Sequence, residues 1–147
     1  MSLFTAREVK MKVHGSCHCN QVKFTAEVDP KLTSICHCND CQKLTGTAFR
    51  LSVPALKGSF TLTSGQPSVY VKVAESGSRR AQAFCPNCGS PLYTYDAENP
   101  TAFSLRVGVL DERSQLPPTW QKWCNSSLSW VQNISELEQA QGNARIS

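Results

Sequence analysis

Short runs in which apolar and polar residues alternate recur along most of this chain. In the clearest run, Val22, Phe24, Ala26 and Val28 alternate with polar side chains, which is the period-two pattern of a half-buried strand. Turn-forming residues such as glycine, proline and aspartate separate the runs at intervals of about eight to twelve positions. The pattern predicts strands at residues 10–14, 22–28, 32–36, 48–53, 60–63, 69–73, 80–84, 92–95 and 103–110.

Helical periodicity is confined to two short segments. Residues 40–44 form one expected helical turn that ends at Gly46, and residues 135–138 begin another. Many short strands with so few helical turns are typical of an all-β domain. We therefore predict an all-β fold with few short helical turns.

The segment that follows residue 118 differs from the rest, because it reads as coil and contains three tryptophans. We interpret Trp120, Trp123 and Trp130 as side chains that fill the core rather than as a platform for a ligand. Residues 139–147 are polar and are expected to be frayed.

Length and composition fit a single domain over residues 1–147. The 40% hydrophobic and 18% charged content exclude a disordered or a membrane protein. No apolar run approaches the roughly 20 residues of a membrane helix. Residues 1–12 lack the apolar stretch of a secretory signal. The net charge of +4 is spread along the chain, which does not indicate a nucleic-acid partner. We expect a cytoplasmic protein without a membrane or nucleic-acid partner, and the sequence leaves its oligomeric state open.

Eight cysteines are the main chemical feature of the sequence. A disulfide scaffold is typical of short secreted chains with a signal peptide, and this chain has neither property. Most of the cysteines stand two or three positions apart, too close to bridge one another easily but suited to share one tetrahedral ion. Soft thiolates favour zinc, since iron–sulfur clusters would require four cysteines in each group. The sequence therefore predicts two zinc ions.

One predicted zinc site is closed by four thiolates. The turn from Cys85 to Cys88, followed by Gly89, is typical of a zinc knuckle, and Cys17 with Cys19 can supply the other two ligands. Such a site is structural and contributes to folding outright. In an alternative partition, the knuckle cysteines pair with those of the second site, and the first two cysteines are unliganded or hold another ion.

The second predicted site consists of Cys36, Cys38 and Cys41, and we call it the claw. Three protein ligands and an open fourth position are the arrangement of a catalytic zinc. The fourth ligand could be water, a substrate, a histidine or Cys124. A single cysteine such as Cys124 is more typically a small buried hydrophobic residue, but as a ligand it would close the site.

The three histidines are weaker candidates for ligands. His18 and His37 each lie between two cysteines in an extended segment, so their side chains are expected to point away from the ion that their neighbours bind. We interpret them as surface or supporting groups. His14 lies near the first cysteine pair and stays a spare ligand.

Three motifs resemble those of one known family, the glutathione-dependent formaldehyde-activating enzymes, also called the centromere protein V family. They are Gly15-Ser16-Cys17-His18-Cys19, Cys36-His37-Cys38-Asn39-Asp40-Cys41 followed by Gly46, and Phe84-Cys85-Pro86-Asn87-Cys88-Gly89, within a motif-bearing part of about residues 12–130. The resemblance implies a β-tent of packed antiparallel sheets with two zinc sites. It implies structural zinc on the first and last cysteine pairs and catalytic zinc on the claw. In the tail, the chain departs from the family, since no histidine lies between Pro118 and Trp130, where many relatives have one.

The resemblance also implies a reaction class. Members of the family are carbon-sulfur lyases, and the type activity joins glutathione to formaldehyde. Zinc held by three thiolates is electron-rich, which favours exchange of its fourth ligand for an incoming thiol. The leading hypothesis is a zinc-dependent lyase that acts on a thiol adduct, in which glutathione is a candidate thiol, of a small aldehyde such as formaldehyde.

Other groups and other functions stay open at the level of sequence. Asp40 and His37 are candidate bases, and Arg50, Arg79 or Arg80 could meet carboxylates of a substrate. The alternative function is a non-enzymatic zinc module that binds a protein or nucleic-acid partner. A redox or zinc-buffering role of exposed thiolates is a third hypothesis.

Overall fold

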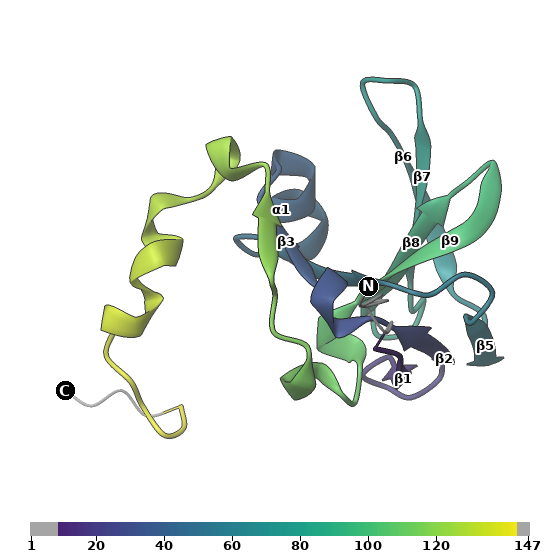
Figure 1. Cartoon of the computed structure of the whole chain (residues 1–147), viewed down its shortest axis with the longest axis horizontal. Coiled ribbons are helices and arrows are strands. Elements are labelled where there is room, and N and C mark those ends of the chain that lie inside the picture. Colours follow the sequence, from purple (N-terminus) through teal and green to yellow (C-terminus); the bar gives the residue numbers. More distant parts are fainter. Residues whose placement is uncertain (1–8, 144–147) are drawn as a thin grey trace, which may run out of the picture.

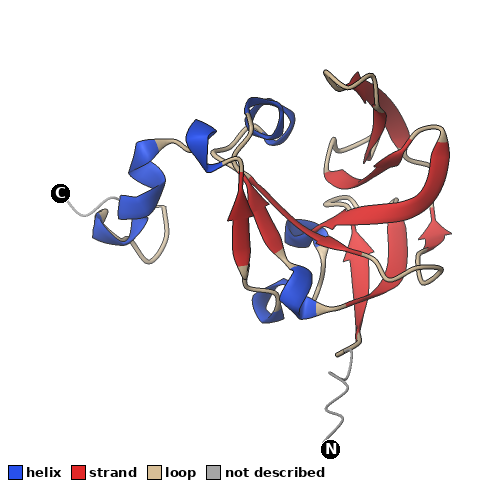
Figure 2. Ribbon diagram, turned by 45° about the horizontal axis from the view of Figure 1, so that its top comes forward, coloured by secondary structure: helices blue, strands red, loops and turns tan. Residues whose placement is uncertain are grey.

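Two β-sheets pack against each other in the computed structural model, which describes residues 9–143 (Figure 1) (Figure 2). The smaller sheet has the order β1-β2-β5, with β1 at Met11–Ser16, β2 at Lys23–Val28 and β5 at Thr61–Ser64. The larger sheet has the order β10-β3-β4-β9-β8-β7-β6. Its strands are β3 at Ser34–Cys36, β4 at Arg50–Pro54, β6 at Ser68–Val73, β7 at Arg79–Phe84, β8 at Pro91–Asp96, β9 at Asn99–Arg106 and β10 at Trp120–Lys122.

The prediction of an all-β fold is confirmed. The pairings within both sheets are antiparallel, except that β10 runs parallel to β3 at the edge of the larger sheet. The helical parts of residues 9–143 are short. They are α1 at Asn39–Thr45 and the 3-10 turns η1 at Pro30–Leu32, η2 at Val107–Val109, η3 at Arg113–Gln115, η4 at Cys124–Ser126 and η5 at Ser129–Glu136.

Two parts of the strand prediction are wrong. The strand expected at residues 103–110 is β9, which begins at Asn99 and gives way to the turn η2 after Arg106. Val107 and Leu110 are buried in that turn as they would be in a strand, so burial alone did not separate the two conformations. Strand β10 was not expected from the sequence. This three-residue strand forms because it pairs with β3 at the edge of the larger sheet.

The core lies between the two sheets. From the smaller sheet it receives Val13 and Phe24, and from the larger sheet it receives Val53, Tyr93 and Leu105, all of them buried. The rings of Phe24 and Tyr93 meet edge to face with centroids 5.6 Å apart, a favourable arrangement of aromatic pairs. This apolar layer fixes which face of the larger sheet is turned away from the smaller one.

That other face carries polar residues, and it positions the candidate site. Residues that lie directly opposite each other in neighbouring strands share a face. Cys36 lies opposite Arg50. Arg106 lies opposite Ser52, which is on the same face as Arg50 because it follows two positions later in β4. The side chain of Gln82, from β7, reaches the same place, because it accepts hydrogen bonds from both arginines. A thiol of the claw and a group of polar side chains therefore share one face.

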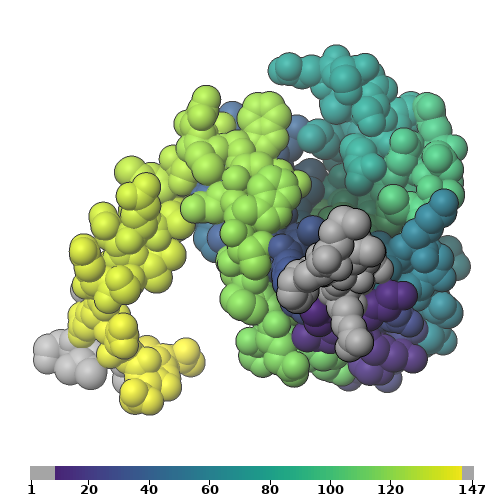
Figure 3. Space-filling model, viewed as in Figure 1, coloured from purple at the N-terminus to yellow at the C-terminus, as the bar shows by residue number. Residues whose placement is uncertain are grey.

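The C-terminal segment leaves the body of the molecule (Figure 3). The interpretation of its tryptophans as core residues is wrong, because Trp120, Trp123 and Trp130 are 50%, 66% and 54% exposed. A tryptophan-rich sequence does not by itself supply a surface to bury the rings against. Of the segment 139–147 that was expected to be frayed, only residues 139–143 are described, and residues 144–147, like residues 1–8, lie outside the described residues. None of the helices among residues 9–143 is long and apolar enough to cross a membrane.

Candidate metal centres

The sulfurs of Cys17, Cys19, Cys85 and Cys88 lie within 4.8 Å of one another. The first two follow β1 and the last two follow β7, so the loop after one strand of the small sheet meets a turn of the large sheet. The sulfur of Cys19 lies 3.6 Å from that of Cys17 and 3.7 Å from that of Cys85. Four thiols at this spacing can hold one metal ion.

Backbone N–H groups are directed at two of these sulfurs. The N–H of Val22 donates to the Cys17 sulfur at 3.2 Å, and the N–H of Cys88 reaches the Cys85 sulfur at 3.5 Å. A hydrogen bond with the Ser90 hydroxyl is the largest influence that lowers the pKa of Cys88, to about 5. Donors aimed at a sulfur stabilise a thiolate, which is the form that binds metal.

The claw is assembled by the junction of β3 and α1. Cys36 ends β3, Cys38 caps the N-terminus of α1, and Cys41 lies in the first turn of that helix. The three sulfurs lie within 4.8 Å of one another, and the N–H of Cys41 donates to the Cys38 sulfur at 3.3 Å. Gly46 ends the helix with a φ of 68°, a conformation that glycine adopts without strain. The helical turn expected at residues 40–44 is thereby confirmed.

The environment of the claw shifts the pKa values of two of its thiols in opposite directions. Burial, and then a hydrogen bond with Cys38, raise the pKa of Cys41 to about 12. Burial also acts to raise the pKa of Cys38, but hydrogen bonds from the thiol and the N–H of Cys41 outweigh it, so that the pKa of Cys38 is lowered. Cys38 is half-buried, whereas Cys36 and Cys41 are buried. Cys38, whose pKa is lowered, is therefore also the most accessible thiol of the claw.

Among residues 9–143, no histidine, carboxylate or further cysteine joins the three sulfurs of the claw as a fourth ligand. Cys124 is exposed and belongs to neither cluster, so its interpretation as a small buried hydrophobic residue is wrong. It follows an exposed tryptophan in a turn of the tail, where nothing covers it. His14 is not a spare ligand either, because its N–H and its ring contact the Glu112 carboxylate.

The two histidines between cysteines have different environments. His18 is exposed, whereas His37 is buried with 1% of its surface accessible. The Nε2 atom of His37 lies 2.8 Å from Oε1 of Gln121, and its ring meets Phe49 edge to face. The histidine therefore supports the claw from behind, and its partner Gln121 was not foreseen because it comes from the unexpected strand β10.

Asp40, a candidate base, forms an ion pair with Lys72 that joins α1 to β6. Its Oδ2 atom lies 2.8 Å from Nζ of the lysine. Asp40 is 60% exposed in this pair, and Arg79 is exposed at the start of β7. Arg50 donates from Nη2 to Gln82 Oε1 at 3.2 Å, and Arg106 donates to the same oxygen at 3.2 Å. Arg106 was not foreseen from the sequence. The signal that could have identified it is that it is the one charged residue in the mainly apolar segment 103–110.

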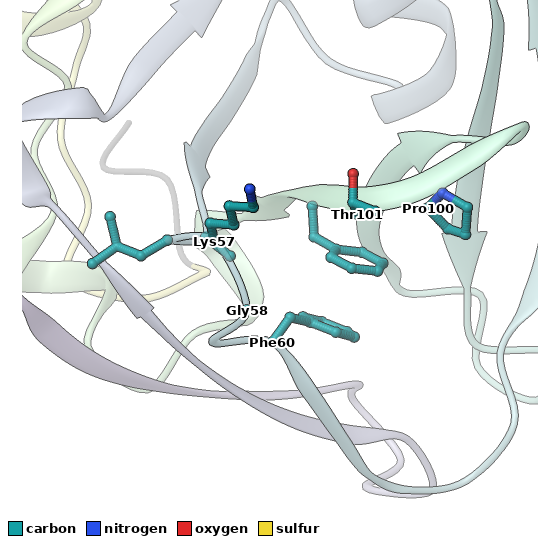
Figure 4. A pocket seen from close by; sticks show the side chains of 8 residues that line it. Lys57, Gly58, Phe60, Pro100 and Thr101 are labelled. Atoms are coloured by element: carbon teal, nitrogen blue, oxygen red, sulfur yellow. The ribbon is translucent and has the colours of Figure 1, made fainter.

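Two cavities differ in their relation to the claw. One, of about 290 Å³, is lined mainly by apolar side chains, among them Phe60 and Phe103, with Lys57 at its rim, and contains no cysteine (Figure 4). The other, of about 300 Å³, lies between α1 and β7 and is lined by Thr45, Gln82 and Arg106 among others. Thr45 donates to the backbone oxygen of Cys41 at 2.7 Å, so the second cavity borders the helix that carries Cys41.

Both clusters are chemically suited to zinc. Their donors are thiols alone, which are soft ligands that favour zinc over magnesium or calcium. The spacing of the sulfurs and the N–H groups directed at them match what a shared ion requires. Either cluster could therefore hold one metal ion.

Comparisons with known proteins agree with this arrangement. The family model described as glutathione-dependent formaldehyde-activating enzyme matches residues 12–126. A crystal structure of a Rhodobacter sphaeroides protein is similar in fold, with a TM-score of 0.55 and 21% sequence identity over 75% of this chain and 99% of that chain. A search of curated proteins finds no match. Since the family model spans most of the chain and all three cysteine motifs, this chain belongs to the glutathione-dependent formaldehyde-activating enzyme family.

Proposed function

We propose that this chain is a zinc-dependent carbon-sulfur lyase that acts on the adduct of a thiol with a small aldehyde, formaldehyde being the model substrate. The observation that carries the proposal is the contrast between the clusters. Four thiols surround one candidate site, whereas three thiols and no further ligand among residues 9–143 surround the other. A shell that the protein leaves incomplete is the arrangement of a catalytic site.

In this proposal, Cys17, Cys19, Cys85 and Cys88 hold a structural zinc, and Cys36, Cys38 and Cys41 hold the catalytic one. When bound at the claw, zinc would supply a Lewis acid that stabilises an incoming thiol as its thiolate. The half-buried Cys38 marks the accessible side of the claw, and the buried Cys36 and Cys41 form its base. Glutathione is the thiol that the family name suggests.

The reaction is the addition of a thiol to a carbonyl and its reverse. In the forward direction, a bond forms between the sulfur and the aldehyde carbon, and the proton that the thiol gives up ends on the former carbonyl oxygen. In the reverse direction, the carbon–sulfur bond breaks and its electron pair returns to sulfur, while the hydroxyl oxygen re-forms the carbonyl and its proton ends on the thiolate.

The test combines a metal count with a rate. The zinc-loaded full chain is mixed with glutathione and formaldehyde, and NMR exchange spectroscopy measures the rate at which the adduct forms and breaks down. We expect acceleration over the spontaneous reaction, loss of that acceleration together with one zinc in Cys38→Ser, and no change in Cys124→Ser, whose thiol is exposed and outside both clusters. A wild-type rate equal to the spontaneous one would overturn the proposal.

A second candidate function is a zinc module that binds a macromolecular partner. The exposed tryptophans Trp120, Trp123 and Trp130 support it, because aromatic residues are enriched at interaction surfaces. X-ray absorption that finds four sulfurs at both metals would favour this candidate over the lyase. The cytoplasmic location also stays a proposal, which eight unbridged cysteines support.

A further inference from the structure

Two arginine side chains converge beside the claw. Both Arg50 and Arg106 donate from Nη2 to Oε1 of Gln82, each at 3.2 Å. Arg50 lies directly opposite Cys36 in the pairing of β3 with β4, which places it next to the claw. Two positive groups therefore meet at one neutral acceptor, an arrangement that repulsion between them disfavours.

Three buried nitrogen atoms of these arginines have no hydrogen-bond partner. Arg106 is only 7% exposed, and its Nε and Nη1 atoms are buried without a hydrogen bond, as is Nε of Arg50. Neither of the ion pairs found within residues 9–143 includes either arginine. A buried guanidinium whose donors are unmet costs free energy that an anion would recover. Burial, followed by the charge of Arg50, lowers the pKa of Arg106, which reports the same cost.

A cavity gives a ligand access to one of these arginines. Arg106 and Gln82 line the space of about 300 Å³ between α1 and β7, which is the size of a small-molecule pocket. Thr45 lines it too, one helical turn after Cys41. A ligand in this space would contact Arg106 on one side and α1, the helix that carries Cys41, on the other, while Arg50 lies opposite Cys36 in the sheet.

We propose that Arg50 and Arg106 bind a carboxylate of the substrate, so that the claw selects thiols that carry a carboxylate over thiols that do not. The inference rests on the proposed function, because it assumes that a thiol occupies the claw. The planar fork of a guanidinium matches the two oxygens of a carboxylate. A monoanion fits better than a phosphate dianion, since three thiolates around one divalent ion already leave a negative charge nearby.

The experiment compares two thiols that differ only in this group. Isothermal titration calorimetry measures the binding of 3-mercaptopropionate and of 3-mercapto-1-propanol to the zinc-loaded full chain. We expect the wild type to bind the carboxylate about 10- to 100-fold more tightly. Arg106→Gln and Arg50→Gln should lose that preference while the affinity for the alcohol stays unchanged. Using both variants guards against one that fails to fold, since Arg50 is only half-buried.

The matched control is Arg79→Gln, which removes the same charge from an exposed position of β7 and should keep the preference. Three results would overturn the inference: equal binding of both thiols by the wild type, a preference that survives in both variants, or stronger competition by inorganic phosphate than by propionate. A loss of zinc and of affinity for both thiols alike in the variants would also overturn it, because the arginines would then serve the claw alone.

The same data separate this inference from the proposed function. If both thiols bind the wild type equally well, the binding of a thiol at the claw is supported and the binding of a carboxylate by the arginines is refuted. If neither thiol binds, the proposed function and the inference fall together.

Discussion

His37 and Gln121 are 84 residues apart in the chain, and Nε2 of the histidine lies 2.8 Å from Oε1 of the glutamine. This bond ties β10 to the segment between two thiols of the claw. Two further bonds support the first, because the Gln42 side chain donates to the backbone oxygens of His37 and Ser126 at 2.9 and 3.0 Å. The tail therefore holds the claw in place from a position remote in sequence.

The hydrogen bond can be removed by Gln121→Leu, which leaves the buried ring of His37 without a partner for Nε2. An unmet buried polar group costs about 1–3 kcal/mol, so we expect a loss of that size in the free energy of unfolding. Chemical denaturation measures it, and a zinc-affinity titration should show weaker binding at the claw. Gln115→Leu in the exposed turn η3 is the control. Equal stability of both variants would show that β10 is not held through this bond.

The two metal clusters predict opposite effects of losing one thiol. Cys88→Ser removes a ligand from the cluster that joins the loop after β1 to the turn after β7, so it should destabilise the whole fold by several kcal/mol or prevent folding. Cys38→Ser should lose one zinc while the fold survives. Native mass spectrometry and circular dichroism together distinguish the outcomes. A folded Cys88→Ser protein with normal stability would contradict the structural assignment.

On acidification, the claw should lose its zinc ion before the other cluster does. Metal binding requires thiolates, and protons compete with the metal more strongly where the folded-state pKa of the thiol is high. In the claw, burial raises the pKa of Cys41 to about 12, although at Cys38 burial is outweighed by hydrogen bonds from Cys41 that lower the pKa. In the other cluster, the hydrogen bond with Ser90 lowers the pKa of Cys88 to about 5, although the pKa of Cys85 is raised, so the largest shifts in the two clusters are opposite. Between about pH 8 and about pH 5, a zinc indicator should therefore report release from the claw first. Release of both ions in a single step would contradict this order.

Gly15 in the first cysteine motif has a packing role. A Cβ atom added there would overlap the ring of Phe24, which is 1% exposed at the centre of the core. Gly15→Ala should therefore lower the free energy of unfolding by about 1–3 kcal/mol, the usual cost of overpacking. Thermal denaturation measures the change. Gly108→Ala, where an added Cβ meets nothing within 4 Å, is the control and should be near neutral.

Much of the fold followed from local patterns. Alternation of apolar and polar residues located β2, since a strand with one buried face must repeat every two residues. Spacing within the chain placed the claw, because Cys36, Cys38 and Cys41 are neighbours whatever the rest of the molecule does. These features depend only on residues close in sequence.

What only the tertiary structure decided depends on residues far apart. Strand β10 exists through its pairing with β3, and the exposure of Cys124 follows from where the tail runs, so neither could be inferred from local periodicity. The meeting of Arg50 and Arg106 at Gln82 depends on the register of strands that are not adjacent in the sequence. The sequence by itself determined that the three thiols of the claw lie close together, whereas the tertiary structure decided that Cys17 and Cys19 join Cys85 and Cys88. The tertiary structure decided that no described fourth ligand closes the claw and that two arginines with unmet donors lie beside it, because both facts arise from the packing of distant strands.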